Sequence, residues 1–171
     1  MIGAEYVREM ARYNSWQNNQ LIPILRGLND EVLNQERGAY FGSILATANH
    51  ILWSDQLWMS RFANVEAPAA NFAKGTEMTA SLQEWEIQRF RTDSAINRWA
   101  KHIKSIDLTG YLNWFSVVNH REYSKPIGVC IMHMFNHQTH HRGQLHVMLT
   151  SVGCQGAVTD VTFMPDKEDC L

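Results

Sequence analysis

Hydrophobic side chains recur with the period of an α-helix in four long stretches of this 171-residue chain. In each stretch an apolar residue returns every three or four positions, which places these residues on one face of a helix. The four stretches cover roughly residues 3–28, 42–65, 80–105 and 125–152. They predict four helices of about 25 residues each.

Residues that start and stop helices support these boundaries. Ser81 is followed three residues later by Glu84, the spacing of a capping box at the start of a helix. The fourth helix begins beside Pro126 and ends before Gly153, which is the usual placement of proline and glycine at helix ends. Pro23 predicts a kink or a break near the end of the first helix.

The segments between the helices show weaker patterns. Residues 29–41 are consistent with one short turn of helix, 66–79 with a loop, and 106–124 with either a short β-hairpin or an irregular crossover. The tail, 154–171, is predicted to be non-helical. Four helices and few strand signals predict an all-α fold, a four-helix bundle that occupies residues 1–171 as a single domain.

Composition and charge narrow the class of protein. Hydrophobic residues make up 45% of the chain and the formal net charge is −2, which argues against a disordered chain and against a basic surface for nucleic acid. The first residues carry charges where a signal peptide needs an apolar run, and no apolar stretch approaches the roughly 20 residues of a membrane span. Cys130, Cys154 and Cys170 are an odd number without Cys-x-x-Cys spacing, so we expect free thiols in a cytoplasmic protein. Neither nucleic acid nor membrane is expected as a partner.

Histidine, a common metal ligand, is concentrated in the fourth predicted helix. Five of the eight histidines lie within residues 133–146. At 100° per residue, His141 lies near the apolar face of this helix and His137 lies somewhat further from it. His133 and His140 lie further round, at the rim of a site or in contact with its ligands. Because His133 and His141 are about 12 Å apart along the axis, one ion can bind His137 with either of them, and the inward position favours His141.

The second predicted helix offers a third histidine, His50, and an acidic residue, Asp55. The helical period places His50 well off the apolar face, so this pattern alone does not bring it to the other histidines. Asp55 falls on the inward face, where a carboxylate needs a partner. We expect Asp55 to orient a ligand histidine, to pair with Arg142, or to occupy a partly hydrated position near a helix junction.

Missing motifs exclude several other classes of metal protein. Carboxylate-bridged di-iron bundles need Glu-x-x-His pairs, and none occurs in this sequence. The His-Glu-x-x-His motif of zinc proteases is absent as well. The remaining possibility is a mononuclear centre bound by three histidines.

The residues that follow His141 have predicted supporting roles. Gly143 destabilises a helix interior by about 1 kcal/mol relative to alanine, which indicates close approach by another helix. Gln144, three residues after His141, is placed to accept a hydrogen bond from the free ring N–H of a ligand histidine. Arg142 is a partner for an acid such as Asp55, or for an acid across a dimer contact.

Four sequence blocks, in order, resemble the DinB/YfiT-like superfamily, a group associated with metal-dependent enzymes. The blocks are ARYNSWQNNQLIPIL, SILATANHILWSDQLW, HMFNHQTHHRGQ and TDVTFMP, and they extend over almost the whole chain. The first contains a Tyr-Asn-x-Trp-x-Asn pattern that begins at Tyr13. The resemblance implies that His50, His137 and His141 together bind the metal, and it supplies the role for His50. It also implies a four-helix bundle with a long crossover before the last helix, and a homodimer, which six tryptophans in so short a chain also favour.

The chemistry follows from the ligand set. Three neutral imidazoles leave an open position on a divalent ion, which is the arrangement of a catalytic site. Members of the superfamily with a similar triad include thiol-dependent S-transferases and isomerases. We therefore expect a hydrolase or a transferase that uses a low-molecular-weight thiol, with a small molecule as substrate and zinc or nickel as the metal. The alternative is a metal-binding stress or interaction protein without turnover, which a fourth protein ligand such as His133 or Asp55 would favour.

Overall fold

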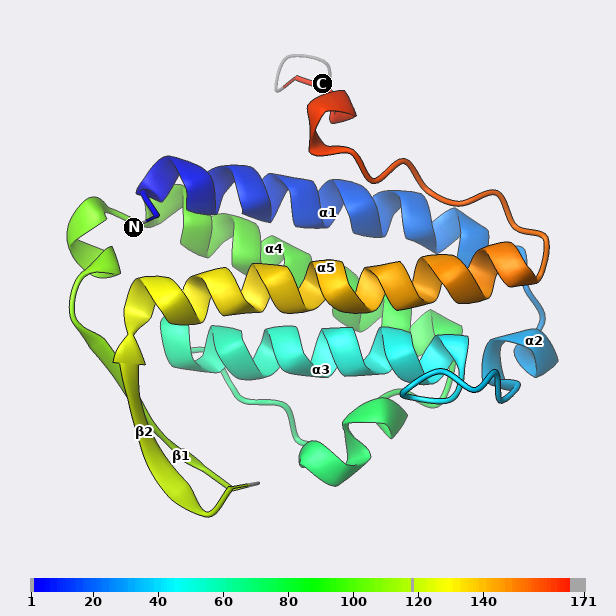
Figure 1. Cartoon of the computed structure of the whole chain (residues 1–171), viewed down its shortest axis with the longest axis horizontal. Coiled ribbons are helices and arrows are strands. Elements are labelled where there is room, and N and C mark those ends of the chain that lie inside the picture. Colours follow the sequence, from blue (N-terminus) through cyan, green and yellow to red (C-terminus); the bar gives the residue numbers. More distant parts are fainter. Residues whose placement is uncertain (1, 118, 167–171) are drawn as a thin grey trace.

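The computed structural model describes residues 2–117 and 119–166 and shows a mostly helical protein. Four long helices lie side by side (Figure 1): α1 (Ala4–Arg26), α3 (Ile44–Phe62), α4 (Leu82–His102) and α5 (Ile127–Ser151). Each helix falls inside one of the four predicted segments, and its ends differ from the prediction by a few residues at most. Pro23 does not break α1, which continues to Arg26.

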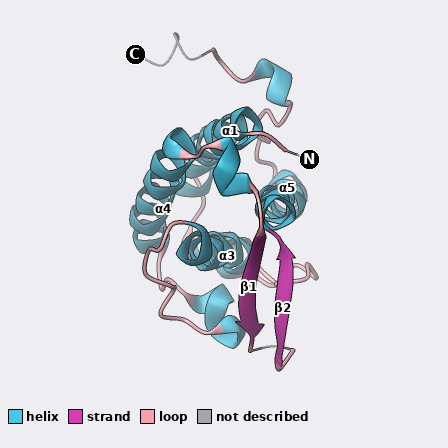
Figure 2. Ribbon diagram, turned by 90° about the vertical axis from the view of Figure 1, so that its left-hand side faces the viewer, coloured by secondary structure: helices cyan, strands magenta, loops and turns pink. Residues whose placement is uncertain are grey.

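The long helices enclose a shared interior. α1 contacts α4 and α5, and α3 contacts the same two helices from the opposite side (Figure 2). One apolar cluster includes the buried side chains of Leu25, Leu33, Ile44, Leu52, Trp85 and Leu145. A second cluster includes Val7, Met59, Ile96, Ile131, Met134 and Phe135. Each such side chain contributes roughly 1.5–3 kcal/mol through burial, so the two clusters dominate the stability of the fold.

A layer of polar residues lies between the two apolar clusters. We call these residues the polar layer: Asn14, Asn18, Asp55, Arg89, Asp93, Gln138 and Arg142. They occupy the middle of the four long helices, between the stretches that supply the two clusters. The fold therefore places its buried charges at the level where the candidate histidines also lie.

Short elements connect the long helices. α2 (Asp30–Asn34) is the single short helix predicted after α1, and the 3-10 helix η1 (Phe72–Glu77) lies in the loop after α3. Between α4 and α5, a second 3-10 helix, η2 (Ser105–Leu108), precedes an antiparallel hairpin of β1 (Tyr111–Ser116) and β2 (Arg121–Pro126). The hairpin was one of two alternatives for this segment, so the all-α prediction is confirmed only in its coarser form, a mostly helical fold.

A row of aromatic side chains fixes the hairpin against the helices. Trp114 of β1 contacts Trp58 of α3 edge-on, with ring centroids 5.7 Å apart, and stacks on Tyr123 of β2 at 5.3 Å. The Arg61 guanidinium lies over the rings of Trp58 and Trp114, 4.6 and 5.2 Å from their centroids. The hairpin, which extends past α3 in Figure 2, thereby forms a wall beside that helix.

The segment after α5 returns across α1 (Figure 1). The Tyr13 hydroxyl donates to the carbonyl of Thr159 at 2.5 Å, and the Gln17 amide donates to the carbonyl of Val158 at 2.7 Å. The described part of this tail contains one short 3-10 helix, η3 (Val161–Phe163), so the prediction of a non-helical tail is wrong for these three residues.

Two expectations from composition concern the thiols and the membrane. Cys130 is buried and Cys154 is partly exposed, and both are free thiols as predicted. Cys170 lies outside the described residues. Across the described ranges, none of the helices is both long and apolar enough to cross a membrane.

Candidate metal centre

Three histidines from two helices meet at the level of the polar layer. His50 of α3 and His141 of α5 are 7% and 6% exposed, and His137 of α5 is half-buried. The Nε2 atoms of His50 and His137 are 3.1 Å apart, and the candidate ligand atoms of all three residues lie within 4.8 Å of one another. These are the three histidines that the sequence and its resemblance single out as a group.

The spacing of these nitrogens fits one metal ion. Metal–nitrogen bonds are about 2.0–2.1 Å long, so two imidazoles on one ion hold their nitrogens about 3 Å apart. The pair formed by His50 and His137 has this spacing, and a ring movement of about 1–2 Å brings the nitrogen of His141 into the same shell. Without an ion, two nitrogen lone pairs at 3.1 Å need a proton between them.

The three rings are held in the neutral form that a metal requires. Burial lowers the pKa of His50 to about 4 and that of His137 to about 3, and neighbouring histidines add to both effects. Burial also lowers the pKa of His141, whereas its hydrogen bond with Gln144 opposes this shift. A neutral imidazole presents a lone pair at neutral pH, so the electrostatics favour a bound cation.

The two histidines of α5 differ in how their second ring nitrogen is held. His141 Nδ1 lies 2.7 Å from Gln144 Oε1, and donation of the ring Nδ1–H to this oxygen leaves Nε2 as the ligand atom. This is the hydrogen bond predicted for Gln144. His137 Nδ1 is buried and has no hydrogen-bond partner among the described residues. The structure therefore fixes the tautomer of His141 but not that of His137.

Phe41, which no sequence motif indicates, forms another side of the cluster. Its ring stacks on that of His50 with centroids 3.8 Å apart, and it lies 5.1 Å from the ring of His141. Phe41 precedes Ser43, whose side chain caps α3 by accepting a hydrogen bond from the backbone N–H of Ala46. The only sequence signal for Phe41 was its place just before this cap.

His50 lies inside although the helical period placed it off the apolar face. α3 is contacted by α4, α5 and η1, and most of its residues are buried. The prediction from helical period assumes that one face of a helix meets solvent. Because α3 is covered on several sides, a residue away from the main apolar stripe still points into the protein.

His133 and His140 lie at the edges of the cluster. Both are exposed, and neither belongs to the group whose ligand atoms converge. The His133 ring lies 5.7 Å from that of His137, and the His140 ring lies 4.7 Å from that of His141. These positions agree with the prediction that His133 and His140 lie at the rim of the site. Neither residue forms a hydrogen bond with the three central histidines in the described structure.

Asp55 and Arg142 do not form the predicted hydrogen-bonded pair. Asp55 is fully buried and accepts hydrogen bonds from Arg89 Nη1 at 2.7 Å and from Gln138 Nε2 at 2.8 Å. Arg142 donates instead to the side chain of Asn14, and burial lowers its pKa to about 10, which leaves it charged at neutral pH. The prediction failed because Arg89 comes from α4, which the sequence did not connect to the site.

The polar layer ties α1 and α4 to the helices that carry the histidines. Asp93 of α4 accepts hydrogen bonds from Asn14 and Asn18 of α1, the two asparagines of the Tyr-Asn-x-Trp-x-Asn pattern. Arg89 Nη2 lies 2.7 Å from Asp93 Oδ1, so Arg89 bridges two carboxylates. Through Asp55, this network reaches Gln138, the residue that follows His137. It thus fixes the part of α5 that carries two of the histidines.

The predicted close approach of another helix at Gly143 is not present among the residues that the structure describes. A Cβ atom added at Gly143 would meet no described atom within 4 Å outside its own helix. The glycine lies on the exposed side of α5, and packing within the described chain does not explain it.

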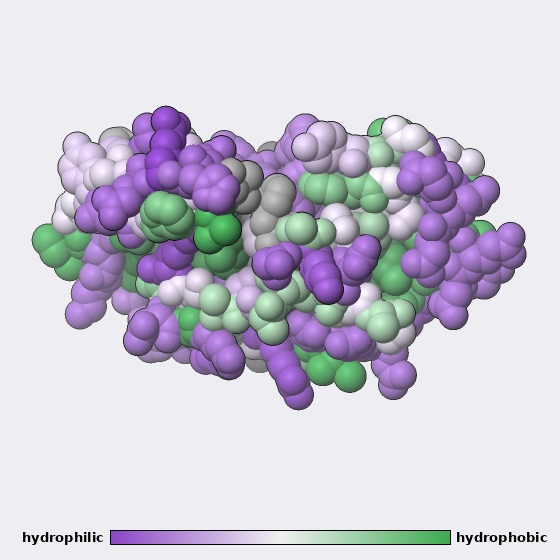
Figure 3. Space-filling model, turned by 90° about the horizontal axis from the view of Figure 1, so that it is seen from below, coloured by the Kyte–Doolittle hydropathy of each residue, from purple (hydrophilic) through white to green (hydrophobic). Residues whose placement is uncertain are grey.

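A pocket of about 520 Å³ opens beside the histidine cluster. His50 and His137 reach it, and Trp53, Trp58 and Trp114 supply aromatic surface. The hairpin and the loop after α3 contribute further walls. Figure 3 shows the side of the molecule on which the hairpin and this loop lie, where hydrophobic side chains are interspersed with hydrophilic ones. The histidines therefore adjoin a space large enough for a small molecule.

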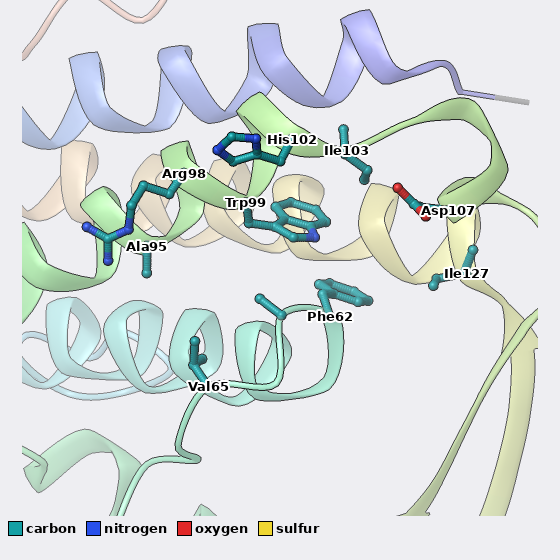
Figure 4. Close-up of a pocket in the computed structure, with 10 residues that line it drawn as sticks. Phe62, Val65, Ala95, Arg98, Trp99, His102, Ile103, Asp107 and Ile127 are labelled. Carbon is teal, nitrogen blue, oxygen red and sulfur yellow. The ribbon is translucent and has the colours of Figure 1, made fainter.

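A larger pocket, of about 640 Å³, lies elsewhere, between the end of α3, the second half of α4 and the start of α5 (Figure 4). Phe62 and Trp99 stack at its centre with ring centroids 5.5 Å apart, and Arg98, His102 and Asp107 lie at its edges. It shares no lining residue with the histidine pocket, and no converging group of metal-binding side chains lies in its described lining. The candidate metal centre therefore adjoins the smaller pocket.

The fold and the cluster define a class of mostly helical proteins with a three-histidine candidate metal centre. The chain belongs to the DinB family, whose family model matches residues 1–169. It is 24% identical over 160 residues to protein DinB of Bacillus subtilis (strain 168), an alignment that covers 92% of each chain. These matches confirm the resemblance seen in the four sequence blocks.

Solved structures share the fold. A DinB-like protein from Bacillus cereus has a TM-score of 0.62 and 21% identity, over 84% of this chain and 91% of that chain. A DinB-like protein from Bacillus subtilis also has a TM-score of 0.62, with 12% identity, over 88% of this chain and 96% of that chain. At these identities the likeness establishes the mostly helical fold and carries no information on activity.

Proposed function

We propose that the protein is a metal-dependent enzyme whose four-helix bundle holds one divalent ion through His50, His137 and His141 and acts on a small molecule. The observation that carries the proposal is the convergence of three neutral imidazoles beside an open pocket. No fourth histidine, cysteine or acidic residue joins the group within the described ranges. An ion held by these three ligands therefore keeps a coordination position for water or substrate.

The bound ion would supply Lewis-acid chemistry: it lowers the pKa of water, polarises an oxygen or binds a thiolate. The protein supplies the rest. Gln144 holds the proton on His141 Nδ1 so that Nε2 remains a ligand. Asp55 is engaged by Arg89 and Gln138, so it orients no ligand and acts as no base. These features support hydrolysis, or transfer involving a low-molecular-weight thiol, with zinc or nickel as the metal.

The alternative is a metal-binding protein without turnover, which needs a closed coordination shell. The two residues considered as a fourth ligand do not favour it. Asp55 accepts a hydrogen bond from Arg89 in the polar layer. The ring of His133 lies at the rim, with its centroid 5.7 Å from that of His137. The open pocket beside the histidines therefore supports the catalytic proposal more strongly.

Metal analysis of the purified protein tests the metal part of the proposal. We expect one ion per chain in the zinc- or nickel-loaded protein. His50→Ala, His137→Ala and His141→Ala should each lose most of it. His133→Ala at the rim and His102→Ala in the other pocket are matched histidine controls and should retain it. Loss of metal in His133→Ala with retention in His141→Ala would contradict the ligand set.

An activity screen tests the catalytic part. The metal-loaded protein is assayed for thiol conjugation to electrophiles and for hydrolysis of small esters and amides. Turnover that disappears in His137→Ala and persists in His102→Ala is the expected result. A protein that binds one ion per chain but shows no turnover in either screen would support the non-catalytic alternative.

A further inference from the structure

The pocket beside the histidines contains a positive charge that no carboxylate of residues 2–117 and 119–166 pairs with. Arg61 of α3 lines this pocket and is half-buried. No aspartate or glutamate of the described ranges forms an ion pair with its guanidinium. Arg89 of the polar layer, by contrast, contacts both Asp55 and Asp93. Within the described part of the chain, the charge of Arg61 is therefore left without an ion-pair partner.

Two tryptophans hold the guanidinium in place without neutralising it. It lies 4.6 Å from the ring centroid of Trp58 and 5.2 Å from that of Trp114, and both rings also line the pocket. Burial lowers the pKa of Arg61, which indicates that the charge is partly removed from water. A positioned, partly desolvated guanidinium gains more from an anionic ligand than a fully hydrated one does.

The charge and the histidines lie at different ends of the pocket. His50 and Trp58 are eight residues apart on α3, which corresponds to roughly 12 Å along the helix axis. The Arg61 guanidinium lies over Trp58, and the ring contacts lead from there to the cluster: the Trp58 ring lies 5.2 Å from that of His133, which lies 5.7 Å from that of His137. The surface between them includes Ser54 and Leu57 of the same helix, with Trp114 of the hairpin near the arginine. A ligand that reaches both ends must be elongated.

We propose that the pocket binds an elongated small molecule that carries one carboxylate, which pairs with Arg61 while the reacting end lies at His50 and His137. The position of the reacting end rests on the proposed metal function, whereas the recognition of the carboxylate does not. A single guanidinium matches a single carboxylate through two parallel hydrogen bonds, and a dianionic phosphate would call for a second basic group. The tryptophan surfaces cover the apolar body of the ligand.

Binding of 4-phenylbutyrate, monitored by tryptophan fluorescence and by calorimetry, tests this proposal. The same measurement with the uncharged 4-phenylbutyramide and with inorganic phosphate separates charge from shape. We expect the carboxylate to bind better than the other two probes. Arg61→Gln should weaken its binding by about 10- to 100-fold, the loss of one charge-assisted contact, and Arg61→Lys should restore part of it.

Arg121→Gln is the matched control. Arg121 also lies over an aromatic ring, 4.4 Å from the centroid of Tyr123, but it does not line the pocket. This variant should bind 4-phenylbutyrate like the parent protein. Melting temperatures of all variants identify any variant that fails to fold. If Arg61→Gln misfolds, two other comparisons test the proposal: binding of 4-phenylbutyrate by Arg61→Lys and by the parent protein, and binding of the carboxylate and of the amide by the parent protein.

Equal binding of the carboxylate and the amide, or equal binding by the parent protein and Arg61→Gln, would overturn the proposal. Tighter binding of phosphate than of the carboxylate would overturn the choice of ligand, as would failure of 4-phenylbutyrate to bind at millimolar concentration. The titrations are made on metal-free and metal-loaded protein. If the protein binds no metal but its affinity for 4-phenylbutyrate still depends on Arg61, the carboxylate site is supported and the metal function is rejected.

Discussion

At the scale of single residues, the neighbours of each histidine decide how well the candidate centre holds an ion. His141 has an acceptor for its second nitrogen, whereas the corresponding nitrogen of His137 is buried without one in the described structure. Phe41 covers the ring of His50 by stacking. The orientation of His141 is therefore set by a hydrogen bond, and that of His50 largely by packing.

Gln144→Ala should keep the fold and weaken metal affinity by about 10- to 100-fold, because His141 loses the acceptor that orients its ring. A competition titration with a chelator measures the affinity. Asn136→Ala, an exposed polar residue on the same helix, is the control and should leave it unchanged. Unchanged affinity together with a lower melting temperature for Gln144→Ala would mean that Gln144 acts through packing alone.

The metal-free protein should lose stability as the pH falls from 7 to 5. The pKa of His50 is lowered to about 4 and that of His137 to about 3, so the unfolded state, in which histidine has its ordinary pKa of about 6.5, binds more protons in this window. Stability therefore rises with pH up to about 7 and these two groups contribute no further change above it. Urea unfolding at several pH values measures the effect.

The double variant with His50→Asn and His137→Asn is the control. It distinguishes the contribution of these two histidines to the pH dependence of stability from that of acidic residues that titrate in a neighbouring pH range. Its free energy of unfolding should depend less steeply on pH between 5 and 7 than that of the parent protein. Identical slopes for the two proteins would show that the histidines are not buried in the neutral form.

At the scale of elements, the polar layer joins the four long helices through charged residues that lack access to water. Arg89 connects α4 to α3 through Asp55, and Asp93 connects α4 to α1 through Asn14 and Asn18. A buried ion pair need not stabilise a fold relative to apolar residues, but removal of one partner leaves the other charge uncompensated. The layer therefore fixes the relative position of the helices that supply the histidines.

Asp55→Asn should destabilise the protein by about 3 kcal/mol, because Arg89 loses one of its two buried counter-charges. Urea unfolding of the metal-free protein measures the change. Glu5→Gln is the control, since Glu5 forms an ion pair with Arg8 at the surface and its side chain is 89% exposed; it should have little effect. A similar small effect for both variants would show that the polar layer does not tie the helices together.

Sequence spacing predicted what lies within one element and little of what lies between elements. Spacing along a single helix is enough to predict the four long helices, the inward position of His141 and the hydrogen bond between His141 and Gln144. The burial of His50 depends on how many neighbours cover α3, and the partner of Asp55 depends on the position of α4. A helical period carries neither kind of information, and for His50 only the resemblance to known proteins supplied it.

At the scale of the whole molecule, the tryptophans are better covered than their number suggested. All six are buried or half-buried within one chain, so they provide no exposed aromatic surface that needs a partner. Exposed apolar side chains occur at several places on the surface, one of them on α4, where Ile87 and Phe90 are 48% and 72% exposed. The homodimer stays a prediction, and these residues are a place to test it.

Sedimentation at micromolar concentration should give twice the 19.7 kDa mass of the chain. Phe90→Glu should shift the equilibrium toward the monomer if the outer face of α4 contributes to the interface, because it introduces a charge into an apolar contact. His120→Glu, a change at an exposed residue of the hairpin turn, is the control. A monomeric mass for the parent protein would contradict the prediction.

The most direct test of the central claim is X-ray absorption spectroscopy of the zinc-loaded protein. The account predicts one zinc ion with three imidazole nitrogens at about 2.0–2.1 Å, completed by oxygen from water. The imidazole signal should fall to two in any His50→Ala protein that still binds zinc. A fourth imidazole, a sulfur at about 2.3 Å, or no bound zinc would contradict an open centre built from His50, His137 and His141.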